Sequence, residues 1–203
     1  FGQELGERAE DAEGFSGKDG RTTIFDYWSV TTVRQWYDSG RCSVSKLSAK
    51  QKKLRNLYKT VLNISRLESA IVRGDFFDLM YVNPNRPTFN TRREFAFLRS
   101  KDDTVILIVA NFSSQEILTD VVVPSHAFDF CKIPERKHVL YDLLSDESIF
   151  ADLKRDGVIS IKVPAYGGRA YKFSTKMNNI DYEFNEHNKD EFPPAHTAEH
   201  LLN

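Results

Sequence analysis

The most recognisable spacing of chemically active residues lies at positions 196–200, HTAEH, in a chain of 203 residues. The order H-x-x-E-H puts two histidines one helical turn apart, where they bind zinc while the glutamate acts as general base. Such a site also needs a further ligand. This pattern follows Pro193 and Pro194 near the chain end, with no room for a downstream ligand. We therefore expect no catalytic metal site, and only adventitious metal binding by these histidines and His187.

The two cysteines, Cys42 and Cys131, have no metal-ligating neighbours in the sequence. Two thiols so far apart make no disulfide framework, so we interpret them as isolated thiols and leave the cellular compartment open. Lys and Arg number 28 and Asp and Glu number 29, which gives a formal charge of −1. This balance favours neither nucleic acid nor an anionic membrane surface as a partner.

The longest apolar run, residues 104–113 (TVILIVANFS), organises the rest of the chain. It is rich in β-branched residues and far too short to cross a bilayer as a helix. An almost unbroken apolar run predicts a strand that is buried on both faces. Residues 94–99 precede it across a polar turn, and residues 117–123 follow it across another. We expect these three segments to form an antiparallel meander.

The hydrophobic pattern changes to a period of two from Phe76 onward. Short strands at close spacing with little helix predict an antiparallel β-sandwich of about eight strands with Greek-key-like connections. Asp156-Gly157 is typical of a hairpin turn between two of these strands. The strand candidates are residues 76–82, 94–99, 104–112, 117–123, 138–144, 148–153, 158–163 and 169–174.

Residues 48–73 form the clearest predicted helix. Ser48 and Gln51 fit a capping box at its start, and Gly74 occupies the position of a C-terminal glycine. Apolar residues recur at i, i+3, i+4 and i+7, and most of the Lys and Arg residues fall on the other side. We interpret that basic side as a solvated surface rather than a site for polyanions. A shorter helix is expected over residues 29–37.

The order of these elements resembles the C-terminal end of glycoside hydrolase family 13, the α-amylase superfamily. In that family a GQE-type motif lies at the last strand of a (β/α)8 barrel, a long final helix follows, and an antiparallel sandwich called domain C closes the chain. Residues 2–4 (GQE), 48–73, 109–113 (VANFS) and 163–168 (VPAYGG) stand here in the same order. The resemblance covers about residues 1–175.

The resemblance implies a mainly β fold divided into three parts. Residues 1–74 would be the last strand or loop and the last helix of a barrel, and residues 75–175 would be the all-β domain C. Residues 176–203 form an acidic tail that we expect to be disordered. The chain begins at Phe1 without an initiator Met or a signal peptide, so we interpret it as the interior of a longer polypeptide of unknown localisation.

The resemblance also implies a chemistry, namely retaining hydrolysis or transfer on α-linked glucans. The family uses an Asp nucleophile, a Glu acid/base and a second Asp that holds substrate hydroxyls. It places all three on barrel strands upstream of Phe1, so this chain should contain none of them and should be inactive alone. We expect no cofactor in this chain. A structural calcium in the parent barrel cannot be read from this sequence.

Four residues are candidates for substrate binding in the intact barrel. The resemblance places Gln3 and Glu4 at the catalytic mouth, where we expect Glu4 to support the catalytic residues rather than to touch sugar. Tyr27 and Trp28 could stack on a glucose ring. Their apolar neighbours in the sequence favour packing beneath the barrel instead.

We therefore expect the C-terminal part of an α-amylase-family glycoside hydrolase. The alternative is a non-catalytic carbohydrate-binding or structural module of an amylase-like protein, because domain C can contact glycans or shield the barrel. Without the neighbouring barrel helices, the apolar side of residues 48–73 lacks its usual cover. We expect another chain to bury it, for example by self-association, or the N-terminal third to fold back differently from the family arrangement.

Overall fold

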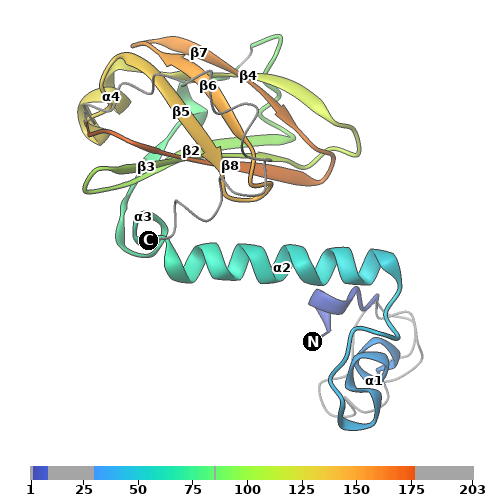
Figure 1. Cartoon of the computed structure of the whole chain (residues 1–203). Coiled ribbons are helices and arrows are strands. Elements are labelled where there is room, and N and C mark those ends of the chain that lie inside the picture. Colours follow the sequence, from blue (N-terminus) through green and yellow to red (C-terminus); the bar gives the residue numbers. More distant parts are fainter. Residues whose placement is uncertain (1, 9–29, 85, 177–203) are drawn as a thin grey trace, which may run out of the picture.

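A computed structural model describes residues 2–8, 30–84 and 86–176 of this chain (Figure 1). The strands gather in one layered body, and the long helix α2 (Ala49–Leu67) extends beside it (Figure 1). Every strand pair in the two sheets is antiparallel. The predicted antiparallel β-sandwich is therefore confirmed.

The N-terminal part consists of short helical elements followed by one long helix. Residues 2–8 hold a 3-10 turn at the position where the sequence predicts the last strand or loop of a barrel. The short predicted helix ends at Tyr37, because Asp38 takes a left-handed φ of 42°. These elements are η1 (Gln3–Leu5), α1 (Thr31–Tyr37), η3 (Asp38–Gly40), α2 and α3 (Ser69–Arg73).

Helix α2 begins at the predicted capping box. The Ser48 hydroxyl accepts the backbone N–H of Gln51 at 3.3 Å, and Oε1 of Gln51 accepts the backbone N–H of Ser48 at 2.8 Å. The first N–H groups of a helix have no partner within the helix, so this exchange stabilises the start of α2.

The prediction of one continuous helix over residues 48–73 is wrong at Glu68. The chain is extended there, with φ −78° and ψ 108°, and this residue separates α2 from α3. The Glu68 side chain contacts the sheet at this break, with its carboxylate 2.8 Å from Nζ of Lys172 on strand β8 (Gly167–Ser174). Beyond the break, Ala70 of α3 is completely buried against the sheet. A straight continuation of α2 would forfeit this contact.

The junction between α3 and the first strand is also held by the sheet. The Arg99 side chain donates from Nε to the carbonyl of Ala70 at 3.1 Å and from Nη2 to the carbonyl of Ile71 at 2.8 Å. Gly74 has a φ of −81°, so it is not the left-handed glycine that the sequence predicts. An added Cβ would lie 2.2 Å from the Ala70 oxygen and 2.6 Å from the Ser100 oxygen. Close backbone approach is thus the reason for glycine here.

Eight strands form the sandwich. The predicted strand over residues 76–82 is correct only in its first half, because the 3-10 turn η4 (Met80–Val82) follows β1. Helix α4 (Ser125–Cys131) has no counterpart among the predicted elements. The strands are β1 (Asp75–Asp78), β2 (Glu94–Lys101), β3 (Thr104–Asn111), β4 (Ile117–Val123), β5 (Arg136–Asp142), β6 (Ser148–Leu153), β7 (Gly157–Val163) and β8.

The strands divide into a sheet of six, in the order β1-β2-β3-β8-β5-β6, and a pair β4-β7. The predicted meander is correct for β2 and β3 but wrong for β4. Strand β8 pairs with β3 over its whole length, from Thr104 opposite Ser174 to Asn111 opposite Gly167. Since β2 occupies the other edge of β3, no edge is left for β4, which crosses to the second sheet.

The Asp156-Gly157 dipeptide forms a turn, with Asp156 at a left-handed φ of 58°, but it does not close a hairpin. Strand β6 before it pairs with β5, whereas strand β7 after it pairs with β4. The turn therefore carries the chain from one sheet to the other.

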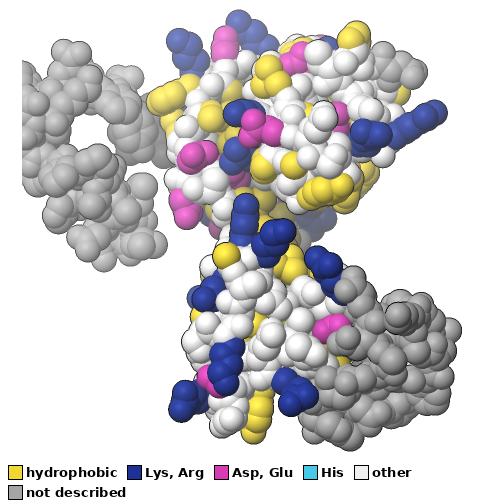
Figure 2. Space-filling view, turned by 90° about the vertical axis from the view of Figure 1, so that its right-hand side faces the viewer, with side chains coloured by type: hydrophobic (Ala, Val, Ile, Leu, Met, Phe, Trp, Pro, Cys, Tyr) yellow, Lys and Arg dark blue, Asp and Glu magenta, His cyan; other side chains and the backbone are white. Residues whose placement is uncertain are grey.

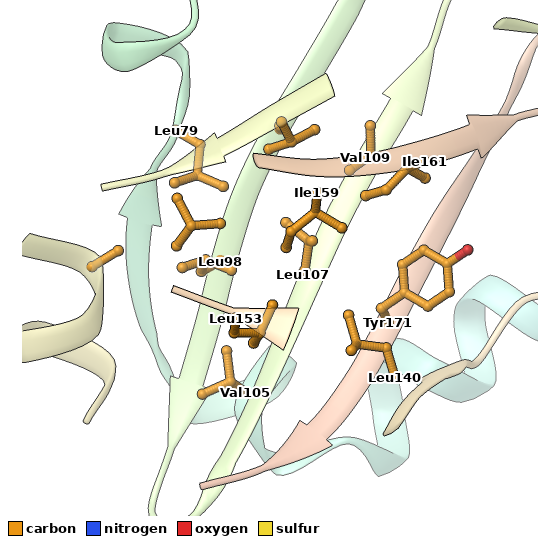
Figure 3. Packing of buried hydrophobic residues seen from close by; sticks show 14 of the residues in the cluster. Leu79, Leu98, Val105, Leu107, Val109, Leu140, Leu153, Ile159, Ile161 and Tyr171 are labelled. Carbon is orange, nitrogen blue, oxygen red and sulfur yellow. The ribbon is translucent and has the colours of Figure 1, made fainter. Parts of the chain in front are cut away.

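Strand β3 is buried on both faces over most of its length, as predicted for its apolar run. Val105, Leu107 and Val109 face the second sheet and belong to the main core, whose packing between the sheets is shown in Figure 3. Ile106 and Ile108 face the opposite way and pack in a separate cluster with Ala70 of α3 and other apolar residues. The six-stranded sheet is thus covered on one face by the β4-β7 pair and partly covered on the other by α3.

Asn111, at the end of β3, joins two connections between the sheets. Its Nδ2 donates to the carbonyls of Gln115 at 2.8 Å and Pro164 at 3.0 Å. Its Oδ1 accepts the backbone N–H and the hydroxyl of Ser113 at 2.8 and 2.7 Å. One buried amide therefore fixes both the β3–β4 turn and the β7–β8 turn.

We predict that residues 68–73 belong to the stable unit of the sandwich. A fragment of residues 68–176 should have a free energy of unfolding about 2–3 kcal/mol higher than one of residues 75–176, because loss of α3 exposes Ile106 and Ala170. Urea unfolding of both fragments measures the difference. A fragment of residues 64–176 serves as control and should match 68–176. Equal stability of the first two fragments would contradict this placement of the boundary.

We predict that Asn111→Ala lowers the free energy of unfolding by roughly 2–4 kcal/mol, because it leaves buried backbone groups at two turns without partners. Denaturant unfolding of the whole chain measures the effect. Ser114→Ala, at an exposed position in the same β3–β4 turn, is the matched control and should change stability little. A loss no larger than that of the control would show that the amide is dispensable.

Candidate functional site

Of the four predicted substrate-binding residues, the structure describes two. Gln3 and Glu4 lie in η1 and are both exposed. Tyr27 and Trp28 lie outside the described residues, as do His187 and residues 196–200. Gly2 and Gly6 flank η1, each with a left-handed φ of 74°, a backbone conformation that favours glycine.

The segment around η1 packs against the neighbouring helices and is closed by its own backbone. Leu5 is only 2% exposed, although η1 is a surface turn. The Glu7 carboxylate accepts the hydroxyl of Thr32 on α1 at 2.7 Å, and the Glu7 N–H donates to the carbonyl of Gly2 at 3.1 Å. The short GQE segment is therefore a fixed part of the helical region.

A groove of about 510 Å³ opens where η1, α1 and α2 meet. Glu4 is the predicted site residue that lines it, and Gln3 does not. The guanidinium carbon of Arg55 lies 5.9 Å from the centre of the Trp36 ring, within the range of a cation–π contact. The lining residues are Glu4, Leu5, Trp36, Arg55, Tyr58, Lys59, Leu62 and Asn63.

Sequence reasoning did not single out the aromatic residues of this groove. Trp36 lies within the predicted helix of residues 29–37 and Tyr58 within that of residues 48–73, so they belong to different elements. A groove assembled from three elements leaves no short motif in the sequence. The sequence feature that could have indicated this groove is an aromatic residue beside basic residues on α2, but that pattern is equally typical of an ordinary amphipathic helix.

Helix α2 has a strongly basic character and an incompletely covered apolar side. It contains no acidic residue and no buried residue. Leu62 and Leu67 are 64% and 65% exposed, and Leu57 and Val61 are exposed as well. Figure 2 shows that the charged side chains visible on the lower lobe are mostly basic. The basic residues of α2 are Lys50, Lys52, Lys53, Arg55, Lys59 and Arg66.

Asp142 is a completely buried carboxylate at the end of β5. Its Oδ2 lies 2.9 Å from Nη1 of Arg169 and accepts the Ser145 hydroxyl at 2.7 Å. Its Oδ1 accepts the backbone N–H groups of Ala170 and Leu144. Burial alone would raise the pKa of Asp142, but these hydrogen bonds outweigh it and hold the pKa below its ordinary value. The carboxylate is an ionised link between β5 and β8, with its oxygens occupied.

Glu94 at the start of β2 is a second buried acid with a structural role. Its Oε1 accepts the backbone N–H of Asn90 at 3.0 Å, and its Oε2 lies 2.5 Å from the hydroxyl of Thr119 on β4. The hydroxyl of Thr119 is also 2.9 Å from the carbonyl of Thr88. Glu94 thus ties one sheet to the other.

His138 on β5 is 5% exposed, and its Nε2 lies 2.9 Å from the carbonyl oxygen of Pro134. The ring packs edge-on against Phe173, with centroids 5.2 Å apart. Burial lowers the pKa of His138 below its ordinary value, because the charged imidazolium would lose its hydration. The neutral ring is therefore a core side chain.

The described residues contain no group of three or more His, Cys, Asp or Glu side chains placed to hold a metal ion. Cys42 is exposed and Cys131 is buried, and both are free thiols. Among the helices described, none is both long enough and apolar enough to span a membrane. The surface grooves of the helical part are open to a ligand, whereas the buried acids of the sandwich have their oxygens occupied by hydrogen bonds.

No protein-family model and no curated protein matches this sequence. Among solved structures, an α-amylase from Anoxybacillus is 18% identical with a TM-score of 0.45, over 70% of this chain and 26% of that chain. The α-amylase of Geobacillus thermoleovorans is 18% identical with a TM-score of 0.45, over 68% and 26% of the two chains. Trehalose-6-phosphate hydrolase of Bacillus licheniformis is 16% identical with a TM-score of 0.41, over 64% and 20%. This chain spans only about a fifth to a quarter of these proteins, and likenesses of this size assign no family.

We predict that His138 makes the fold sensitive to mild acid. Because the folded chain holds His138 at a lowered pKa, the unfolded chain binds its proton more readily, and stability falls as the pH drops through the unfolded value of about 6.5. In His138→Gln, the free energy of unfolding should therefore decrease less between about pH 7.5 and 5.5 than in the natural chain.

Urea unfolding at each pH measures this decrease. The matched control is His126→Gln, at an exposed position, which should retain the pH dependence of the natural chain. The same pH dependence in His138→Gln and the natural chain would show that another group is responsible.

Proposed function

We propose that this chain is the C-terminal part of an α-amylase-type glycoside hydrolase that acts on α-linked glucans. The order of the GQE turn, the long helix, the VANFS strand and the VPAYGG turn supports this assignment. In this proposal η1 and α2 complete a catalytic barrel, and the β-sandwich is the domain that follows it. The glucan would be bound mainly by the barrel.

The observation that carries the proposal is the uncovered apolar side of α2. Leu57, Val61, Leu62 and Leu67 are between 43% and 65% exposed. Full burial of an exposed Leu or Val side chain is worth roughly 1.5–3 kcal/mol, so each of the four would gain about half of that by complete burial. A 19-residue helix with no buried residue is typical of an element that packs against further protein. We infer that the remainder of a barrel covers this side in the parent protein, and that the isolated chain self-associates through it.

The roles of the buried acids support the second half of the proposal, that this segment is inactive alone. Retaining hydrolysis needs two carboxyl groups across the anomeric carbon, roughly 5–5.5 Å apart. Asp142 and Glu94 are buried, and their carboxylate oxygens accept hydrogen bonds from other groups of the sandwich. They serve the sandwich, and the catalytic Asp, Glu and Asp would come from upstream strands.

We propose supporting roles for the predicted site residues in the assembled barrel. Glu4, in the turn between Gly2 and Gly6, would orient loops at the catalytic mouth, with Gln3 beside it. Tyr27 and Trp28 would pack beneath the barrel, with sugar stacking as the less favoured role.

The test compares two proteins, the purified 203-residue chain and the product of the longest reading frame that contains it. The longer protein should release reducing sugar from starch and maltooligosaccharides, whereas the 203-residue chain should release none. Stoichiometric activity of the 203-residue chain would overturn the claim that it lacks the catalytic residues. Inactivity of the longer protein, combined with absence of the three carboxylates, would favour a non-catalytic module instead.

A further inference from the structure

The loop that joins η4 to β2 carries three arginines without an acidic partner. Arg86, Arg92 and Arg93 all lie within residues 86–93. None of the three side chains forms an ion pair or a hydrogen bond with any described residue. Unpaired positive charge that is concentrated in one loop suits an anionic ligand.

The other arginines in the described part of the sandwich are all engaged by the sandwich itself. Arg155 and Arg169 form ion pairs with acidic side chains. Arg99 and Arg136 donate to backbone carbonyls. The arginines that serve the sandwich structure therefore have partners, and those of the 86–93 loop are the exception.

Arg86 and Arg92 line the same hollow, which has a volume of about 290 Å³. We propose that this hollow binds a phosphate group. No acid is among its lining residues, and an amide and a hydroxyl add further hydrogen-bond donors. The lining residues are Arg86, Pro87, Phe89, Asn90, Thr91 and Arg92.

Arg86 is the more deeply placed of the two cations. Its side chain is half-buried, and its Nε is buried without a hydrogen-bond partner in the part of the chain that the structure describes. A positive charge that is withdrawn from water without a counter-charge is destabilising. An anion at the outer nitrogens of this guanidinium would supply the counter-charge, and it would not have to reach Nε.

The loop that forms the hollow is fixed by contacts of its own. The carbonyl of Thr88 accepts the hydroxyl of Thr119 on β4 at 2.9 Å. The Asn90 side chain accepts the backbone N–H of Arg92 at 3.1 Å, and Phe89 is only 2% exposed. The backbone that carries Arg86 and Arg92 is thus held in place before any ligand arrives, which lowers the entropy cost of binding.

The pair of guanidinium groups favours phosphate over a carboxylate. A carboxylate has two oxygens in one plane, and a single Arg can bond to both of them. A phosphate group has oxygens in several directions and carries close to two negative charges at neutral pH, so it can satisfy two Arg side chains at once. The volume lies at the lower end of the range for small-molecule sites, which suits a small anion better than a polymer.

The hollow belongs to the side of the sandwich away from α3. Thr88 is bonded to β4, and the β4-β7 pair covers the face of the large sheet opposite to the face on which Ala70 packs. The inference therefore depends neither on what covers α2 in a longer protein nor on the proposed glycosidase function.

The experiment uses the purified 203-residue chain and isothermal titration with sodium phosphate at about pH 7.5 and low ionic strength. We expect a dissociation constant of about 1 mM. Arg86→Gln and Arg92→Gln should each weaken binding by roughly tenfold, because each removes one guanidinium from the hollow. Arg86→Lys keeps the charge but loses the planar fork, so its affinity should lie between those of the natural chain and Arg86→Gln.

The matched control is Arg73→Gln, which removes the same charge from an exposed position on α3 and should bind phosphate as the natural chain does. Thermal unfolding without phosphate confirms that each variant is folded. Arg92 is exposed, so its variant keeps the test valid if the Arg86 variants do not fold.

Three results would overturn the proposal. The first is a lack of phosphate binding by the natural chain. The second is unchanged binding in the folded Arg86 and Arg92 variants, which would place the phosphate elsewhere. The third is equal weakening in Arg92→Gln and Arg73→Gln, which would show diffuse attraction to the net charge rather than a site.

A second titration, with glycerol 3-phosphate, identifies the source of the phosphate group. Tighter binding than that of inorganic phosphate, weakened in Arg92→Gln, would uphold the site and assign it to a phosphate ester. Equal or weaker binding, with the same dependence on Arg92, would uphold it as a site for free phosphate. Neither result bears on the release of reducing sugar by the longer protein, so failure of the phosphate site and failure of the proposed glycosidase function are distinguishable.

Discussion

The burial of strand β3 on both faces is the constraint on which the rest of the structure depends. Strand β3 carries apolar side chains on both faces of its sheet, so both faces must be shielded from water. The β4-β7 pair shields only one of them. The second cover is α3, which is only five residues long and must lie directly over Ile106. The break at Glu68, its ion pair with Lys172 and the close backbone approach at Gly74 all follow from placing that short helix.

The two parts of the chain use their polar residues for different purposes. In the sandwich, buried polar groups such as Asp142, Glu94 and Asn111 are consumed by bonds that join strands and turns. In the helical part, the polar groups around η1 and α2 remain at the surface of a groove and beside exposed leucines. The buried polar groups of the sandwich therefore provide rigidity, and recognition is left to groups at the surface.

Local signals in the sequence predicted the elements well, and long-range pairing explains the errors. The capping box at Ser48 is a local exchange of hydrogen bonds, and the alternation of the strands is local too, so both were readable. The break at Glu68 allows Ala70 to pack against Ile106 and Ala170, which are far away in the sequence, so no local pattern indicates it. The predicted meander is also wrong because of a long-range pairing. Strand β8 pairs with the edge of β3 that β4 would need.

The groove was only partly predictable. The family resemblance indicates Glu4, while Trp36 and Tyr58 lie in two segments for which the sequence predicts only helices. Their meeting depends on how η1 packs between α1 and α2, and the buried Leu5 and the Glu7–Thr32 hydrogen bond contribute to that packing. Burial of a leucine in a three-residue turn carries no signature in the sequence.

Only one extended residue, Glu68, joins α2 to α3, so a small rotation of its backbone would displace the far end of the long helix. Helix α2 has 19 residues and is therefore about 28 Å long, so a rotation of roughly 10° at Glu68 would move its far end by about 5 Å. The groove lies along α2, while α3 is held to the sheet by the packing of Ala70 and by the hydrogen bond from Arg99. Substitutions near Glu68 can therefore re-aim the helical part as a whole, without altering either the sandwich core or the groove itself.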